Sequence, residues 1–265
     1  MTDPVLVREQ AVRLGVFFTI LTAMAVWESV AARRVRTVAR LRRWPANLGV
    51  AVLDSLLTRA VAPAGAVGFA LFAEARAWGL LQLAGWPAWL EVIVAVVALD
   101  FAIYAQHRAF HLVPVLWRFH RMHHADVEVD VTTGARFHPV EMLLSFGLKC
   151  LVIAALGAPA VSVLVFEVLL NATAMFNHSN VKVPEALERV LRCFVVTPDL
   201  HRVHHSVLRR ETDSNFGFNL PWWDWLFRTY RAQPEAGHDG MTLGLEQFRG
   251  AEESRLDRLL TQPFR

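Results

Sequence analysis

Two short segments of the chain carry the same spacing of three histidines. Residues 119–126 read FHRMHHAD, and residues 201–205 read HRVHH. The histidines concerned are His120, His123 and His124 in the first segment, and His201, His204 and His205 in the second. On an α-helix, residues three and four positions apart share a face, so each segment would present its three imidazoles together. Because neutral imidazole binds zinc, copper, nickel and iron, the spacing predicts two helices that offer ligands to metal ions.

Further histidines extend this pattern. His107 and His111 lie four residues apart in HRAFH, and His178 lies in FNHSN. Together these segments hold nine of the eleven histidines, more than the roughly four to six ligands that one ion accepts. The number therefore predicts two metal ions. His138, in RFHPVE, fits a ligand and a structural residue equally well, whereas His238, in AGHDG, is expected on the surface.

Other metal and cofactor chemistries fit the sequence less well. Cys150 and Cys193 are the two cysteines and form no CxxC motif, which argues against a disulfide framework, a cysteine-bound zinc module and an all-cysteine iron–sulfur cluster. The HExxH motif of zinc hydrolases is absent, and the set lacks the carboxylates typical of soluble di-iron bundles. Neither GxGxxG nor a P-loop occurs, so no residue is assigned to an organic cofactor.

Long apolar segments must position these histidines. The chain of 265 residues is 54% hydrophobic, with a mean hydropathy of +0.33. A helix of about 20 apolar residues spans a bilayer, and residues 14–32, about 47–72 and 86–107 approach this length. Residues 143–176 form two shorter apolar passes around the sequence GAP at 157–159, which predicts a helical hairpin. We therefore expect an all-α integral membrane protein with about three spanning helices plus a hairpin; the alternative is a soluble protein with a buried helical core.

A run of six arginines in residues 33–44 sets the expected orientation. Basic loops favour the cytoplasmic side of a membrane, and no zinc finger or RNA-binding motif supports a nucleic-acid partner for this run. With residues 33–44 in the cytoplasm, alternation of the spans brings all the clustered histidines to that same side. The sequence thus predicts a helical cap on the cytoplasmic side that carries a histidine-bound dimetal site. Imidazole ligands alone, at the membrane surface, favour iron that handles oxygen.

Six motifs resemble one known family. The sequences LDFAIYAQHRAFH, LWRFHRMHHAD, TTGARFHPVE, FNHSNV, TPDLHRVHHS and NFGFNLPWWDWLFRTY are similar to those of the integral-membrane fatty acid hydroxylase / sterol desaturase superfamily. The resemblance covers about residues 45–232 of a single domain, 1–265, in which residues 233–265 form a polar C-terminal tail. The chain departs from the pattern at Ala174, where these hydroxylases often have a further histidine, and at Arg228, where a glycine is usual.

The resemblance implies a site, a cofactor and a substrate class. It implies that nine histidines bind two iron ions and that no other residue is catalytic: His107, His111, His120, His123, His124, His178, His201, His204 and His205. It implies O2 as co-substrate and a membrane lipid, such as a sterol or a fatty acyl chain, that is hydroxylated or desaturated. Which lipid is used, which of the two reactions occurs and the oligomeric state are left open.

The chain carries no flavin, haem or ferredoxin signature, so electrons must come from an external NAD(P)H-linked donor. We expect a separate reductase or a cytochrome or ferredoxin carrier, for which the arginine run is a docking surface. The arginine- and alanine-rich composition favours a bacterial inner membrane. Two rival hypotheses remain, a non-catalytic metal-binding membrane protein and a zinc-dependent membrane hydrolase.

Partners for the second imidazole nitrogens are also expected, because they fix which nitrogen faces the metal. The candidates are four acidic residues: Asp100, Asp126, Asp199 and Glu141. For Asp199 a structural role is an equal alternative, since Thr197 and Pro198 read as the start of a helix. The tryptophans of NLPWWDWLF are expected near the membrane interface.

Overall fold

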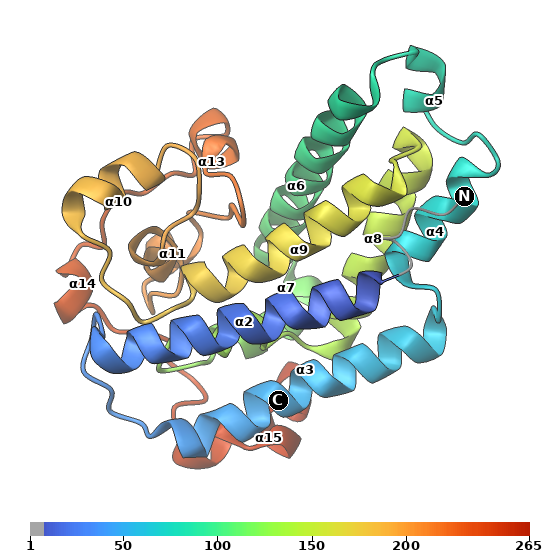
Figure 1. Ribbon diagram of the computed structural model, residues 1–265. Helices are drawn as coiled ribbons and strands as arrows, with labels where there is room; N and C mark the ends of the chain where they lie inside the picture. Colours follow the sequence, from blue (N-terminus) through green and yellow to red (C-terminus); the bar gives the residue numbers. More distant parts are fainter. Residues whose placement is uncertain (1–7) are drawn as a thin grey trace.

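Helices account for the regular structure in residues 8–265, the part of the chain that the computed structural model describes (Figure 1). This part holds no β-strand. Its β-type backbone pairing is limited to two isolated bridges, Ala32–Val181 and Ser206–Leu243. The predicted all-α fold is therefore confirmed.

Five helical segments are long and apolar enough to cross a membrane. They are α2 (Glu9–Val30), α3 with α4 (Arg40–Val61 and Gly65–Glu74), α6 (Ala88–Leu112), α8 (Pro139–Leu156) and α9 (Ala160–Asn177). These are the three predicted spans and the two arms of the predicted hairpin. The second span is broken between α3 and α4, around Pro63, because proline cannot continue the hydrogen-bond ladder. The chain is an all-α integral membrane protein.

The hairpin turn is fixed by glycine. Gly157 ends α8 in the left-handed region at φ 66°, a conformation that glycine adopts without steric cost. Gly79, at φ 93°, lies directly against it, and a Cβ on Gly79 would be 1.9 Å from the Gly157 nitrogen. The Leu80 N–H donates to the Ala155 carbonyl at 3.1 Å. The segment before α5 (Leu81–Ala84) is thereby joined to the hairpin at the end remote from the histidines.

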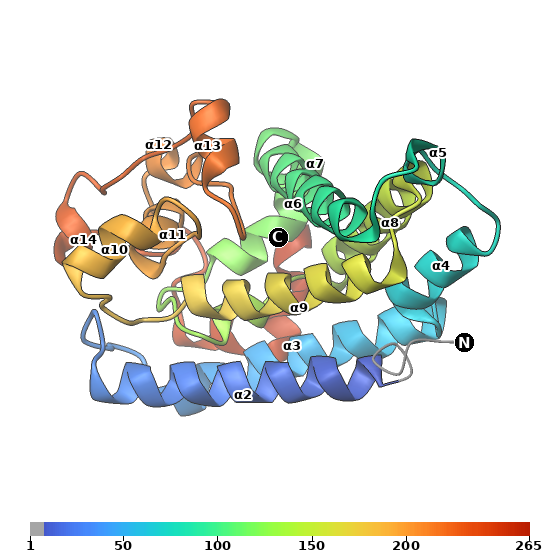
Figure 2. The same cartoon turned by 45° about the horizontal axis from the view of Figure 1, so that its top comes forward.

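Shorter helices form a cap at the other end of the spans (Figures 1 and 2). They are α7 (Pro114–His124), η1 (Thr133–Ala135), α10 (Glu185–Leu191), α11 (Pro198–His204), α12 (Arg209–Thr212), α13 (Trp222–Leu226), α14 (Gly237–Gly240), η2 (Ala251–Ser254), α15 (Leu256–Thr261) and η3 (Gln262–Phe264). Proline occupies the first position of both α7 and α11, and the Thr197 hydroxyl accepts from the Leu200 N–H at 3.4 Å. The start of α11 is therefore the one predicted from Thr197 and Pro198.

The arginine run fastens the cap instead of forming an exposed face. Arg43 is fully buried and donates to Asp126 and Asp130, at 2.6 and 2.7 Å. Arg36 and Arg40 contact Glu28, at the end of α2. The remaining pairs are Arg33 with Asp239 and Arg34 with the Met241 carbonyl, which leaves Arg42 exposed. Most arginines of the expected docking surface are thus bound to internal partners, some of which lie about two hundred residues away in the sequence.

The C-terminal residues pack on this fastened region. Leu259 of α15 is buried in a small apolar cluster with Ala46, Val50 and Met122, from α3 and α7. The Arg121 guanidinium donates to the Gln262 carbonyl in η3. Residues 233–265, although polar in composition, therefore contact the elements that carry the histidines.

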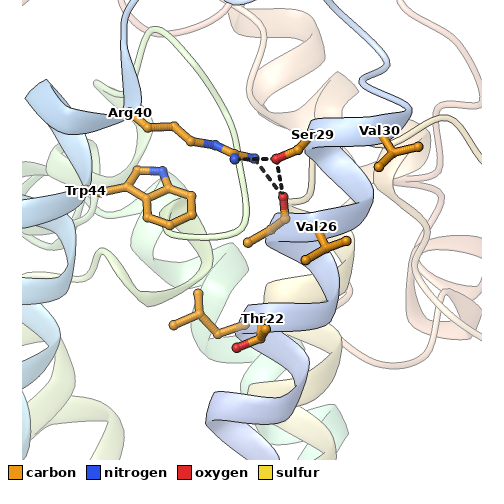
Figure 3. Close-up of a pocket in the computed structure, with 8 residues that line it drawn as sticks. Thr22, Val26, Ser29, Val30, Arg40 and Trp44 are labelled. Carbon is orange, nitrogen blue, oxygen red and sulfur yellow. Dashed lines mark hydrogen bonds between the residues drawn. The ribbon is translucent and has the colours of Figure 1, made fainter.

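A groove of about 410 Å³ lies between α2 and α3 (Figure 3). Apolar side chains such as Leu21 and Val26 line it, and at one end Arg40 donates to the Ser29 hydroxyl at 2.7 Å. None of the nine clustered histidines lines this groove, so it is separate from the candidate site.

Candidate metal centre

The nine histidines lie together in two adjacent groups. The five-histidine group consists of His107, His111, His120, His124 and His204. The four-histidine group consists of His123, His178, His201 and His205. Within each group one nitrogen of every ring lies within 4.8 Å of those of the other rings, and all nine side chains are buried. The rings of His124 and His205 link the groups, with centroids 4.6 Å apart.

Both HxxHH segments contribute to both groups. In α7, His120 and His124 belong to the five-histidine group, whereas His123 points to the other. At the end of α11, His204 belongs to the five-histidine group, whereas His201 and His205 belong to the other. The one-residue offset of the doubled histidine rotates its ring by about 100° around the helix, and this places two ligand sets side by side.

The remaining histidines come from the ends of two spans. His107 and His111 share a face in the last turns of α6, and His178 directly follows α9. The ends of the apolar helices therefore meet the cap at the imidazole cluster, as the alternation of spans predicts.

One nitrogen of six rings is held by a hydrogen-bond acceptor. The pairs, from Nδ1 to oxygen, are His107 with Phe216 O at 2.7 Å, His111 with Asp213 Oδ1 at 3.1 Å, His120 with Glu141 Oε1 at 2.7 Å, His123 with Arg136 O at 3.1 Å, His178 with Ala174 O at 2.6 Å and His204 with Ser214 O at 2.7 Å. Carbonyl and carboxylate oxygens accept hydrogen bonds, so the proton of each neutral ring is assigned to Nδ1. The Nε2 lone pair of each ring is then left free.

These free lone pairs face one another. His107 Nε2 lies 3.1 Å from His120 Nε2, and His123 Nε2 lies 3.1 Å from His178 Nε2. Two unprotonated nitrogens at this distance repel, whereas a cation between them attracts both. Two nitrogens at right angles around an ion, each bound at about 2.1 Å, are about 3.0 Å apart. The donor set therefore fits metal ions.

Unpartnered buried nitrogens support the same interpretation. The Nε2 atoms of His111 and His204 and both nitrogens of His205 are buried and have no hydrogen-bond partner. A buried polar atom without a partner is costly, and such atoms in native proteins commonly face an ion or a water molecule.

Burial keeps these rings neutral. It lowers the pKa of His178 to about 4 and that of His204 to about 3. Burial, together with the neighbouring imidazoles, also lowers the pKa of His123, His124 and His205 well below the ordinary value. These five rings are therefore unprotonated at neutral pH, which is the form that binds metals.

The two histidines outside the groups have structural contacts. His138 accepts from the Val140 N–H at 3.1 Å and so caps α8, while its Nε2 lies 3.3 Å from the Leu260 carbonyl. The expectation that His238 lies on the surface is wrong. Its ring is buried beside Asp199, with His238 Nε2 3.7 Å from Asp199 Oδ2, because the polar segment around it packs on α11.

Of the four predicted acidic partners, Glu141 contacts one of the nine clustered imidazoles, that of His120. The other three pair elsewhere: Asp100 accepts from the Trp223 indole at 2.8 Å, Asp199 contacts Arg202, and Asp126 contacts Arg43. Burial alone would raise the pKa of Asp126, but the charges of Arg43 and Arg136 outweigh it and lower this pKa to about 2. Asp126 is thus an ionised structural residue.

Sequence reasoning missed Asp213 and the backbone acceptors. Asp213 lies in LRRETDSNF, where nothing in the spacing ties it to His111, about a hundred residues earlier. The carbonyls of Ser214 and Phe216 carry no signal of residue type at all. The Ala174 carbonyl, at the position where a further histidine was expected, accepts from His178.

Two phenylalanines cover the cluster on the side of the spans. The Phe137 ring stacks on His123 with centroids 4.5 Å apart, and the Phe218 ring lies 5.0 Å from His107. Both pack against the apolar cluster formed by α4, α6, α8 and α9. Apolar side chains therefore bound the imidazoles on the membrane side.

Comparisons with known proteins agree with this architecture. The family model described as fatty acid hydroxylase matches residues 92–229, just over half of the chain, and this range includes all nine histidines. The ornithine lipid hydroxylase OlsE of Rhizobium tropici is 33% identical over 149 residues, covering 56% of this chain and 44% of that protein. The human alkylglycerol monooxygenase is 27% identical over 154 residues, covering 58% and 34%.

A third relative is the fatty acid hydroxylase vlmA of Lecanicillium sp, which is 28% identical over 168 residues and covers 54% of this chain and 43% of that protein. The matches thus span less than half the length of each of these three relatives. No solved structure matches the chain. With its histidine-bearing half matched by the family model, the chain belongs to the fatty acid hydroxylase family.

Proposed function

We propose that the chain is an O2-dependent oxidoreductase that hydroxylates a membrane lipid at a di-iron centre bound by the nine histidines. One observation carries the proposal: two adjacent groups of buried imidazoles turn unprotonated Nε2 atoms toward shared centres. The apolar helices and the family membership supply the lipid context.

Bound iron would supply the activation of O2 that an unactivated C–H bond requires. For hydroxylation, one oxygen atom enters the C–H bond and the other leaves as water, which consumes two electrons and two protons. The histidines would hold the ions, and the Nδ1 acceptors would orient the rings. Phe137 and Phe218 would exclude water on the membrane side, where we expect the lipid chain to approach.

Hydroxylation is favoured over desaturation because the three relatives described above are named as hydroxylases or a monooxygenase. Their names refer to an ornithine lipid, an alkylglycerol and a fatty acid, which share an aliphatic chain attached to a polar group. We therefore propose a lipid with a long alkyl chain as the substrate class; a sterol remains an alternative within the superfamily.

Electrons would come from a separate NAD(P)H-linked reductase or a cytochrome or ferredoxin carrier. Most of the arginine run is paired internally, so it offers little exposed charge for the docking of this carrier. The same arginines still favour the cytoplasmic side of the membrane for the metal centre, and the arginine- and alanine-rich composition favours a bacterial inner membrane. We also propose that residues 1–265 act as one domain, since the C-terminal helices pack on α3 and α7.

A bacterial host with and without the gene would test the function. We expect a lipid that gains 16 mass units in cells that express the chain, with the added oxygen labelled under 18O2; a loss of two mass units would indicate desaturation. His123→Ala should abolish the product, because it removes one of the two facing Nε2 atoms of the four-histidine group.

His238→Ala is the matched control, since this histidine is also buried but lies outside both groups. It should retain the product. Product that persists in His123→Ala, or that forms without oxygen as a zinc hydrolase would allow, contradicts the proposal.

A further inference from the structure

We propose that residues 213–216, here named the acceptor segment, position the five-histidine group, and that Asp224 and Asn215 hold this segment in place. The inference rests on the proposed metal-binding function and deepens it, because it assigns a positioning role to residues with no ligand atom in either group. Asn215, Phe216 and Asp224 all belong to the motif NFGFNLPWWDWLFRTY, so the proposal also assigns a structural role to this motif.

Three of the five histidines are oriented by this one segment. Asp213 Oδ1 accepts from His111, the Ser214 carbonyl from His204, and the Phe216 carbonyl from His107. Those rings stand on two different helices, α6 and α11. A shift of the segment would therefore turn rings from both helices at once, whereas no single helix movement would do so.

Asn215 gives the segment its shape. Its backbone lies in the left-handed region at φ 53°, which asparagine tolerates better than most residues. Its side-chain amide donates to the Leu200 carbonyl at 3.0 Å and to the Arg231 carbonyl at 2.8 Å. Because Leu200 directly precedes His201 in α11, Asn215 also ties the segment to the second HxxHH helix.

Asp224 fixes the end of the segment. Its fully buried carboxylate accepts from the N–H groups of Phe216 and Gly217, at 2.9 and 2.8 Å, and from the Thr229 hydroxyl at 2.6 Å. A buried carboxylate is stabilised by such N–H and O–H donors, so its position and that of the segment depend on each other.

Two rings of the four-histidine group have separate supports. His123 Nδ1 contacts the Arg136 carbonyl and His178 Nδ1 contacts the Ala174 carbonyl, and both carbonyls lie outside residues 213–231. Loss of Asp224 should therefore loosen one metal site selectively. A residue that merely stabilised the whole fold would affect both sites equally.

Metal release from the purified full-length chain tests this selectivity. The protein would be loaded anaerobically with Fe2+ in lipid nanodiscs, and release to a chelator would be followed with iron counted per chain. For Asp224→Asn we expect biphasic release, in which one ion is bound about 10–100-fold more weakly and the other is unchanged. Asn keeps one acceptor oxygen but places an NH2 group against a backbone N–H. It therefore weakens the attachment of the acceptor segment, while all five histidines of the group remain in the chain.

Asp213 offers a second variant, because its side chain is partly exposed and its replacement should leave the fold intact. Asp213→Ala should also weaken one ion, whereas Asp213→Asn keeps an acceptor for His111 and should restore binding. Arg228→Gly, in the same motif but with an exposed side chain, is the control and should retain both ions.

Double variants identify which ion is affected. Asp224→Asn added to His111→Ala should cost little further iron, since both act on the five-histidine group. Added to His205→Ala, it should leave neither ion tightly bound. Unchanged release from Asp224→Asn, or equal weakening of both ions, would overturn the inference while the proposed function stood. A wild-type chain that binds no iron would overturn both.

Discussion

Six of the nine imidazoles of the cluster are held through Nδ1 and offer Nε2. Four of the six Nδ1 atoms with acceptors contact backbone carbonyls, and Glu141 and Asp213 supply the two carboxylates. A carbonyl orients a ring without adding a full negative charge. Most of the positive charge of bound ions would therefore remain available to polarise an oxygen ligand.

Arg228 is strained in a position suited to glycine. It follows α13 at φ 59°, and the next N–H, of Thr229, donates back to the Asp224 carbonyl at 2.8 Å. This is the hydrogen bond of a helix end that favours glycine. We expect Arg228→Gly to stabilise the protein by about 0.5–1 kcal/mol, the left-handed strain minus the greater freedom of glycine in the unfolded chain. The measurement is the thermal midpoint, and a lower midpoint would contradict the assignment of strain.

The sequence identified the clustered histidines better than the groups that orient their rings. Histidine spacing selected eight of the nine residues, because helical periodicity turns spacing directly into a shared face. His178 has no histidine neighbour at such spacing and was included through the family resemblance. Supports such as the Phe216 carbonyl depend on long-range packing and on no residue type. His238 was wrongly placed for a similar reason, since its polar neighbours pack on α11.

At the scale of elements, the α3 helix is attached to the cap by a buried ion pair. Arg43 is surrounded by Asp126 and Asp130, and all three side chains are buried. Arg43→Ala would leave the buried Asp130 without this cation and Asp126 with Arg136 alone, 3.6 Å away, and we expect a loss of about 3–5 kcal/mol in stability. Arg42→Ala, one residue away and exposed, should stay within about 0.5 kcal/mol of wild type. Equal thermal midpoints for the two variants would show that the ion pairs of Arg43 contribute nothing to stability.

The remote ends of the spans are joined by two glycines in contact. Gly79→Ala would place a methyl group 1.9 Å from the Gly157 nitrogen, at a φ that alanine rarely adopts. We expect a loss of more than about 2 kcal/mol, from overpacking and backbone strain together. Gly147→Ala, inside α8 with open space around it, should instead gain about 0.5–1 kcal/mol. If both substitutions shift the thermal midpoint in the same direction, the contact between Gly79 and Gly157 is not supported.

Hydropathy located the spans but not their connections. A run of about 20 apolar residues is a local property, so all five segments could be predicted, including the turn at Gly157. The pairing of Arg43 with Asp126 joins residues 83 positions apart, and neither residue type reveals the other. The arginine run was therefore predicted as a surface although it acts mainly as a set of internal contacts.

At the scale of the whole molecule, the imidazole cluster is the place where spans and cap meet. α6 and α9 end there, and α7 and α11 cross it. Nine buried rings with facing lone pairs repel one another unless ions are present, so the junction should be weak without metal. The packing of the cap on the spans and the binding of metal are then one coupled equilibrium.

Metal removal should consequently loosen the entire protein. An ion present at a hundred times its dissociation constant adds about 2.7 kcal/mol of stability per site, so two ions add about 5 kcal/mol. For a chain of this size we expect the thermal midpoint to fall by roughly 10 °C or more after chelation and to recover when Fe2+ is returned. Combined His124→Ala and His205→Ala substitutions, which remove one ligand from each group, should abolish most of this metal-dependent shift. A midpoint that stays constant while the iron is shown to leave would mean that the facing nitrogens are stable by themselves, and the physical basis for placing cations between them would be lost.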